Sequence, residues 1–440
     1  MSAPNGPPAP QAPGDPQDTP EQAEFRARAR AWLAANAPEF AGTVRARLHF
    51  AAARSAEQYE KDELDSVRAA RAWQARLHAG GWAGIAWPEA FGGRGGTPAE
   101  ETIFAAEAAP HDVSVGPLLI GLSMVGPTLM RHGTPAQRDA HLPPLLRGER
   151  VWCQLYSEPE AGSDLAALRT RAVRDGDTWV VTGQKVWTSS ARVADWAILL
   201  ARTDPDVPKH RGITYFLLDM RSPGVEVRPL RQMNGSYHFN EVFLDGVRIP
   251  AGDVVGEVDG GWTVVHTTLA SERAMIGGGG GAKAADLIAL ARARDRADDP
   301  LVRQAIARVH TLDEVLRILG LRMRAALNRG ARPGPEGSIM KLLVARRAHE
   351  AAEVGLALDG TDALLTGDDA PDGPRWRQEL LSAQGLRIGG GTDAIQRNAI
   401  AERILGLPRE PAPDRTVPFR ELAAPAPADA AASPGGPRDR

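Results

Sequence analysis

The feature that most restricts the fold of this chain is a change in sequence pattern near residue 151 and a second change near residue 256. Between these points lie short segments rich in β-branched and aromatic residues, separated by turns such as Asp175-Gly176 and Asp204-Pro205. No helical segment separates them, whereas a doubly wound parallel sheet needs a helix after each strand. Helical periodicity dominates on both sides. The sequence therefore predicts an α+β fold, mostly α, with a middle antiparallel β domain between two helical domains. The predicted strands are Thr178–Thr188, Trp196–Arg202, Ile213–Asp219, Val225–Arg228 and Asn240–Ile249.

The same changes divide the 440 residues into domains. We predict an N-terminal helical domain over residues 19–150, the β domain over 151–255 and a C-terminal helical domain over 256–408. Residues 1–18 and 409–440 are rich in proline and alanine and lack hydrophobic periodicity, so they cannot bury enough apolar surface to offset the entropy of ordering. Both are predicted to be disordered tails.

Two helix starts can be placed from capping sequences. Thr19 is followed by Pro20 and then by Gln22, which is the spacing of a capping box. Thr134-Pro135 predicts a second start of the same kind. Further helical patterns cover residues 66–79 and 101–109. The first helix carries arginines away from its apolar face, which predicts a solvated surface for Arg26, Arg28 and Arg30.

Composition excludes several classes of protein. The 52 Lys and Arg and 55 Asp and Glu residues give a net charge of −3, without the basic patch of a nucleic-acid-binding protein. The single cysteine, Cys153, cannot form a disulfide within the chain, which fits a reducing compartment. No apolar run approaches the ~20 residues that span a bilayer, and the N-terminus lacks a signal-peptide pattern. We expect a cytoplasmic protein that binds no nucleic acid, membrane or metal.

The sharpest signal for chemistry is the pair of segments Ser157–Asp164 and Gly183–Ser189. The Gly162-Ser163-Asp164 turn exposes backbone N–H groups and a short hydroxyl, which suit phosphate or carbonyl oxygens. Trp187 beside two hydroxyls can flank a planar polar heterocycle. Two β-turns and a core tryptophan are the alternative interpretation, and spacing alone leaves both open.

These segments and several others resemble the acyl-CoA dehydrogenase family over about residues 20–410. The additional matching motifs are Trp87-Pro88 with Phe91-Gly92-Gly93, Gly126-Pro127-Thr128, Gly133-Thr134, Asn240-Glu241-Val242-Phe243, Gly260-Gly261-Trp262, Gly391-Thr392 and Ile395-Gln396-Arg397-Asn398. The chain is most similar to the large bacterial members, some of which act on sterol side chains. The resemblance implies a C-terminal four-helix domain, bound FAD, and FAD-dependent α,β-dehydrogenation of an acyl-CoA or a related acyl thioester.

The resemblance also assigns residues to the flavin site. Three residues are implied to approach the edge of the isoalloxazine ring, namely Gln154, Tyr156 and Ser157. Two residues are implied to lie near the flavin or the thioester phosphates, namely Gly162 and Ser163. The opposite flavin face is implied to contact Trp187, Thr188 and Ser189. The C-terminal domain is implied to add Gly391 and Thr392.

The catalytic base is the position at which this sequence departs from many relatives. In the family a carboxylate removes the α-proton while the β-hydride passes to flavin N5, and hydrogen bonds polarise the thioester carbonyl. Many relatives carry the glutamate directly before the C-terminal Gly-Thr, where this chain has Gly390; the Gly390 N–H can still bind the carbonyl. Other branches place the glutamate before an arginine, and Glu272-Arg273 matches that pattern. Glu272 is therefore the predicted base and Asp393 the fallback, while a solvated Glu272 is the alternative.

Five glycines, Gly277–Gly281, follow within the same predicted helix, at a cost of about 1 kcal/mol each relative to alanine. We interpret them as a site where a backbone or a ligand approaches closely; a locally broken helix is the alternative. Their spacing is not that of a phosphate-binding loop.

Elements that bind the remote half of FAD in relatives are altered here. The best match to the arginine that meets the flavin pyrophosphate of a neighbouring subunit is Arg294, and Ala297-Asp298 replaces the Phe-Gly that follows it in relatives. The glycine-rich turn of relatives becomes residues 356–362, which add the carboxylates of Asp359 and Asp362 and so disfavour a pyrophosphate.

Three functions remain open. The first is an active FAD enzyme with variant contacts to the adenine half, which retention of Glu272 and Trp187–Ser189 favours. The second is a catalytically weak or inactive partner subunit of a heteromeric acyl-CoA dehydrogenase complex. The third is a flavin oxidase on the same scaffold. The resemblance also implies a homodimer or tetramer, possibly heteromeric, and an electron-transfer flavoprotein or similar acceptor.

Overall fold

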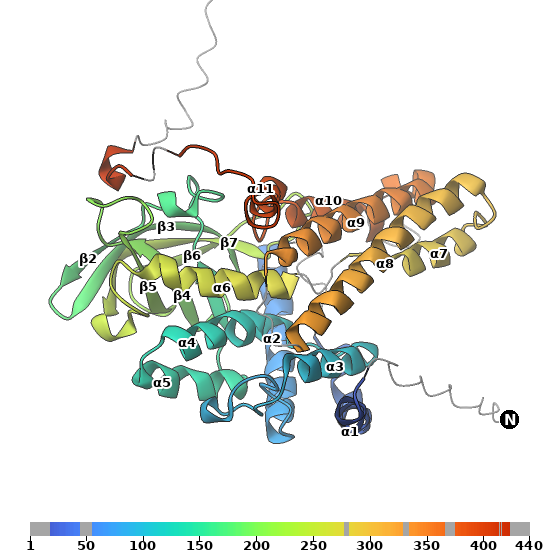
Figure 1. The fold of residues 1–440 in the computed structure, drawn as a ribbon, viewed down its shortest axis with the longest axis horizontal. Coiled ribbons are helices and arrows are strands. Elements are labelled where there is room, and N and C mark those ends of the chain that lie inside the picture. The colour runs from blue at the N-terminus through green and yellow to red at the C-terminus, as the bar shows by residue number, and fades with distance from the viewer. Residues whose placement is uncertain are drawn as a thin grey trace, which may run out of the picture.

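The structure, a computed structural model, describes residues 18–44, 55–276, 281–328, 334–365, 375–412, 414 and 416–422. Its elements follow the predicted order, with helices on both sides of a β domain (Figure 1). Four residues of the glycine run, 277–280, lie outside the described residues; Gly281 adopts a φ of +85°. Within the described ranges, no helix combines the length and the apolar character needed to cross a membrane.

The helices of the N-terminal domain are α1 (Pro20–Asn36), α2 (Ala56–Ala79), α3 (Pro98–Ala108), α4 (Gly126–His132) and α5 (Pro135–Leu146). Capping boxes begin α1, α3 and α5, in which the hydroxyl of Thr19, Thr97 or Thr134 accepts a bond from the backbone three residues later. The starts predicted at Thr19 and Thr134 are thus confirmed. Helix α2 begins at Ala56, capped by Ser55, rather than at residue 66.

The predicted solvated face of α1 is wrong for Arg26, which is buried. Its guanidinium donates to Asp18 at 2.6 Å and to Glu107 of α3 at 2.9 Å. Arg30 donates to the same Glu107 carboxylate at 2.8 Å. These partners are distant in sequence or lie before the helix, so helical periodicity could not reveal them. Asp18, assigned to the disordered tail, is therefore part of the folded domain.

In the middle domain, described without a gap from residue 152 to residue 250, seven strands form one sheet in the order β1-β4-β2-β3-β7-β6, with β5 paired to β4. The strands are β1 (Trp152–Leu155), β2 (Arg171–Asp175), β3 (Thr178–Ser189), β4 (Trp196–Arg202), β5 (Ile213–Asp219), β6 (Val225–Pro229) and β7 (Phe239–Pro250). The long pairings are antiparallel, whereas β1 pairs with β4 in parallel. Strands β1 and β2 are not predicted by the sequence pattern, because both are short and β2 is largely exposed.

The C-terminal domain contains α6 (Gly261–Ile276), α7 (Ala284–Ala293), α8 (Pro300–Asn328), α9 (Glu336–Asp359), α10 (Arg375–Leu386) and α11 (Asp393–Arg403). Helix α6 contacts β5 and α4, so it joins the three domains, while α7–α10 form a bundle that extends away from the sheet (Figure 1). Inside the bundle, Gly355 of α9 allows Trp376 of α10 to approach, since a Cβ at that glycine would lie 2.0 Å from the indole.

Residues 416–422, predicted to be part of a disordered tail, lie against the β domain. Phe419 is buried, with the Arg202 guanidinium 3.8 Å from the centre of its ring. The backbone N–H of Phe419 donates to the Val207 carbonyl at 2.9 Å. Nearby, Lys209 forms ion pairs with Asp164, at 2.6 Å, and with Asp414. A single aromatic residue among prolines carries no periodicity, so this C-terminal segment could not be predicted from the sequence.

Replacing Phe419 with alanine should lower the free energy of unfolding by about 3 kcal/mol, because a buried aromatic ring and its contacts are lost. Urea denaturation measures the change. The matched control is Glu421→Ala in the same segment, where an exposed side chain predicts a change within about 0.5 kcal/mol. Equal stabilities for the two variants would contradict the packing of this segment.

Candidate functional site

Two predicted site segments are joined where β1 ends. The backbone N–H of Val186, directly before Trp187 in β3, donates to the Ser157 carbonyl at 2.9 Å. Gln154 lies half-buried on β1, and Tyr156, which directly follows the strand, is buried. Tyr156 and Ser157 are therefore held beside the end of β3.

A buried ion pair, absent from the predicted site, lies beneath this junction. The Lys185 ammonium donates to Glu158 at 2.8 Å and to the Tyr156 carbonyl at 3.0 Å. The Glu158 carboxylate also accepts the backbone N–H groups of Arg169 and Thr170, at 2.6 and 2.9 Å. Burial alone would raise the pKa of Glu158, but the charge of Lys185 and these hydrogen bonds outweigh it, so the pKa lies below its ordinary value. The sequence could have indicated this pair, because Glu158 lies in the segment Ser157–Asp164 and Lys185 lies in the segment Gly183–Ser189.

The turn at Gly162-Ser163 lies at the surface. Both residues are exposed, and a Cβ at Gly162 would meet no atom within 4 Å, so this chain leaves open space there. Asp164, which follows, is paired with Lys209. The turn is therefore anchored on one side and accessible on the other.

A β-bulge in β3 turns Trp187 toward the surface. The pairing of β3 with β7 shifts register between Lys185 and Thr188, and Trp187 adopts a φ of +62° with 58% of its surface exposed. Its ring makes an edge contact with Phe239 at 5.8 Å. Thr188 is buried and its hydroxyl has no hydrogen-bond partner within the described chain, whereas Ser189 is half-buried.

Helix α6 brings Glu272 toward Tyr156. Thr268, one turn before Glu272, contacts the hydroxyls of Thr128 at 2.9 Å and Tyr215 at 3.2 Å. Tyr215 in turn makes an edge contact with the Tyr156 ring at 6.1 Å. The pKa of Tyr156 lies well above its ordinary value because of burial, and the Glu272 carboxylate acts in the same direction. Helix α6 thus contacts the group of tyrosines beside Ser157, and the Oε2 atom of Glu272, one turn beyond Thr268, is buried.

The Gly390–Thr392 turn lies among the C-terminal helices. Gly390 and Gly391 have φ angles of +65° and +89°, which favour glycine over a residue with a side chain. The Gln396 amide donates to both of their carbonyls, at 2.8 and 3.2 Å, and the Thr392 hydroxyl caps α11. These contacts connect the turn to its own helices; they do not join it directly to Ser157 or Trp187.

The fallback base is already paired. The Asp393 carboxylate accepts from the Arg387 guanidinium at 3.1 Å and lies 3.5 Å from the ammonium of the buried Lys341. Both partners belong to the C-terminal helical domain, so the Asp393 carboxylate is held within that domain.

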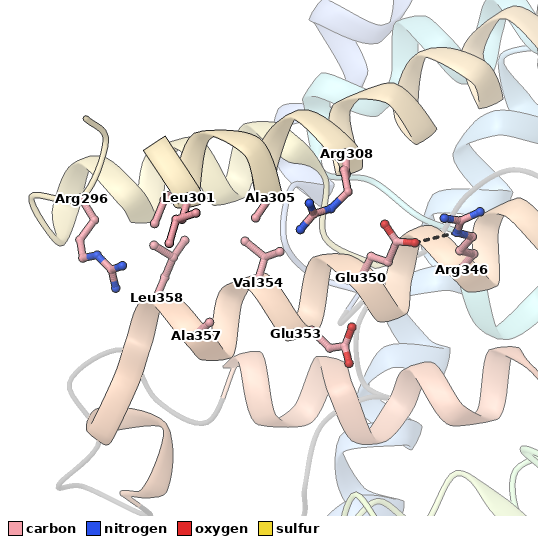
Figure 2. Close-up of a pocket in the computed structure, with 11 residues that line it drawn as sticks. Arg296, Leu301, Ala305, Arg308, Arg346, Glu350, Glu353, Val354, Ala357 and Leu358 are labelled. Carbon is pink, nitrogen blue, oxygen red and sulfur yellow. Dashed lines mark hydrogen bonds and ion pairs between the residues drawn. The ribbon is translucent and has the colours of Figure 1, made fainter. Parts of the chain in front are cut away.

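The predicted pyrophosphate arginine forms ion pairs with carboxylates of its own chain. Arg294 donates to Asp362 at 2.9 Å and to Asp359 at 3.1 Å, so the two added carboxylates of the turn neutralise it. Next to this cluster, a cavity of about 620 Å³ lies between α8 and α9. Figure 2 shows Arg296 at one end and the Glu350–Arg346 pair at the other.

Comparison with known proteins decides the family. The sequence matches the acyl-CoA dehydrogenase N-terminal domain over residues 19–149, the middle domain over 153–247 and the C-terminal domain over 259–405. The acyl-CoA dehydrogenase IpdE1 of Mycobacterium tuberculosis is 38% identical over 397 residues, which cover 88% of this chain and 98% of IpdE1. The chain belongs to the acyl-CoA dehydrogenase family.

Further known proteins are similar to this chain in sequence or in fold. FadE34 of Mycobacterium tuberculosis is 42% identical over 325 residues, and the match spans 73% of this chain but 44% of FadE34. The Tcur3481–Tcur3483 steroid ACAD is 28% identical with a TM-score of 0.73, and the ChsE4–ChsE5 complex of Mycobacterium tuberculosis is 31% identical with a TM-score of 0.70. In both cases the match covers 90% of this chain and 100% of the other. The predicted family, three-domain fold and enzyme class are confirmed.

Members of the acyl-CoA dehydrogenase family generally bind FAD, and the residues of this chain fit one half of it. The exposed Trp187, the hydroxyls of Ser157 and Ser189 and the open space at Gly162 suit a planar ring with polar edges. Arg294, in contrast, is paired with two carboxylates and does not fit a pyrophosphate. The fit is therefore to the isoalloxazine end.

Replacing Glu158 with glutamine should lower the free energy of unfolding by about 3 kcal/mol or more, because Lys185 would stay buried without a counter-charge. Glutamine also offers one acceptor oxygen where the carboxylate receives three donors. Urea denaturation compares this variant with Glu160→Gln, an exposed neighbour expected to change stability by less than about 0.5 kcal/mol. A loss as small as that of the control would contradict the role of the pair.

Proposed function

We propose that this chain is an FAD-dependent enzyme that dehydrogenates an acyl-CoA between its α and β carbons, with Glu272 as the base. The observation that carries the proposal is the contact of α6 with the tyrosines beside Ser157: Thr268, one helical turn before Glu272, lies 3.2 Å from the Tyr215 hydroxyl, and Tyr215 contacts the ring of Tyr156. Two competing positions are weaker. Gly390 has no carboxylate and a backbone conformation that favours glycine, and Asp393 is held in ion pairs.

The residues divide the work as follows. The Glu272 carboxylate takes the α-proton, and the Gly390 N–H donates to the thioester carbonyl oxygen and so makes that proton more acidic. Ser157 and Ser189 offer hydrogen bonds to the ring edges of the cofactor, and Trp187 covers a ring face. Bound FAD supplies the acceptor for the β-hydride, so that an α,β double bond forms.

For the acyl group we propose a steroid-derived acyl-CoA as the first substrate class to test. The support is the similarity to the Tcur3481–Tcur3483 steroid ACAD, at 28% identity over 90% of this chain.

We further propose that the chain works with a different second chain that supplies the pyrophosphate contact. Support comes from the neutralised Arg294 and from the similarity to the ChsE4–ChsE5 complex, which contains two different proteins. The exposed Leu301 lines the α8–α9 cavity and offers apolar surface for such a contact. An electron-transfer flavoprotein is the proposed electron acceptor.

Replacing Glu272 with glutamine should leave the flavin bound but slow its reduction by substrate at least about 100-fold, because the general base is lost. Stopped-flow absorbance of the flavin under anaerobic conditions measures the rate. Asp393→Asn is the matched control and should retain reduction. Unchanged reduction in the Glu272 variant would exclude it as the base. Hydrogen peroxide formed in air by the wild type would favour the oxidase.

Arg294→Ala should not change the flavin content, because the guanidinium is engaged by Asp359 and Asp362. The ratio of visible to ultraviolet absorbance of the purified complex gives the flavin content. Arg296→Ala, an exposed arginine nearby, serves as the control. Loss of flavin in the Arg294 variant alone would show that this arginine does reach the cofactor, against the proposed division between two chains.

A further inference from the structure

Helix α2 of the N-terminal domain contacts the β domain through side chains that neither the sequence motifs nor the proposed chemistry uses. Helix α2 lies along the connection between β3 and β4. The Arg192 guanidinium donates to the Ala56 carbonyl at 3.0 Å, and Arg71 pairs with Asp195 at 2.7 Å. Between these contacts, Tyr59 and Glu63 lie one helical turn apart and are both buried, with 1% and 3% of their surface exposed.

This buried pair of α2 residues contacts the ends of two strands. Glu63 Oε1 accepts from the Ser190 hydroxyl at 2.7 Å, and Ser190 directly follows β3. The Tyr59 hydroxyl lies 3.3 Å from His238 Nδ1, and His238 directly precedes β7. The Ser190 N–H and the His238 carbonyl are 3.4 Å apart, so the strand ends also contact each other.

The ends of β3 and β7 held in this way carry the exposed ring of Trp187 and its neighbour Phe239. Trp187 contacts Phe239, which in turn contacts the His238 ring at 4.9 Å. Trp187 and Ser190 have φ angles of +62° and +56°, a region that costs a residue with a side chain about 1–3 kcal/mol. Such a backbone persists only when its surroundings hold it, and the bond to Glu63 supplies one such constraint.

We propose that Glu63 is a positioning residue that holds the Trp187–Ser190 backbone in its flavin-binding conformation. This inference rests on the proposed function, because it assumes that these residues contact the cofactor. Glu63 itself touches neither cofactor nor substrate and acts through Ser190.

The surroundings of Glu63 indicate how substitutions should behave. Burial raises its pKa, while the Ser190 hydroxyl and the nearby Arg192 charge oppose the shift; Glu60 adds to it. Its second oxygen, Oε2, is buried without a hydrogen-bond partner in the described chain. One acceptor oxygen aimed at Ser190 is therefore the feature that matters, and glutamine preserves it.

The experiment compares amide hydrogen exchange in peptides covering residues 186–192, and FAD affinity, in the wild type and in variants. Glu63→Ala should raise local exchange and weaken FAD binding about tenfold, the scale expected for one hydrogen bond to a charged group. Glu63→Gln should stay close to the wild type. Ser190→Ala removes the same bond from the other side, so the double variant should be no worse than either single one. Glu60→Gln, also on α2 and facing Arg192, is the matched control and should change neither readout.

Three results would overturn the inference: unchanged exchange in Glu63→Ala, exchange raised equally throughout the chain, or no recovery in Glu63→Gln. FAD binding by the wild type tests the proposed function separately. If the wild type bound no FAD in complex with its second chain, the proposed function would fail, whereas the exchange comparison would still decide whether Glu63 holds the backbone.

Discussion

The arrangement of the site depends on the buried Glu158–Lys185 pair. Lys185 lies on β3 and Glu158 follows β1, two strands that are not neighbours in the sheet, so this pair and the Val186–Ser157 bond connect them. A buried charge is costly unless its hydrogen-bonding capacity is filled. Here the Glu158 carboxylate receives three donors, and the Lys185 ammonium donates to the Tyr156 carbonyl as well as to Glu158. The geometry that satisfies the pair therefore also determines how far Ser157 lies from Trp187.

Local patterns in the sequence predicted much of the fold. The strands Trp196–Arg202 and Ile213–Asp219 were placed with the observed bounds, because continuous apolar runs between turn residues leave few alternatives. What could not be predicted was set by partners distant in sequence: the buried Arg26, the docked Phe419 and the contacts of Glu63. For Arg26 and Phe419 the sequence indicated a solvated or disordered role, and a tertiary contact decided otherwise. No role for Glu63 was predicted from the sequence.

The candidate site shows the same division. The motifs drew attention to Ser157 and Trp187, and the bond through Val186 places them together. The consequence of the carboxylates at Asp359 and Asp362 was foreseen as repulsion of a phosphate; their pairing with Arg294 removes the positive charge as well. A phosphate at that position would meet a cluster of net negative charge. Among the described residues, those at the β-domain end suit a planar polar ring, whereas the Arg294 cluster does not suit a pyrophosphate.

The capping boxes of α1, α3 and α5 have a consequence for how the chain reaches this structure. Each is completed within four consecutive residues, so it can form together with the first helical turn and before any domain contact exists. Proline at the first helical position further reduces the number of unfolded conformations that compete. The start points of these helices are consequently a local property of the chain. The slow part of folding is left to the distant pairings of the β domain, such as β1 with β4.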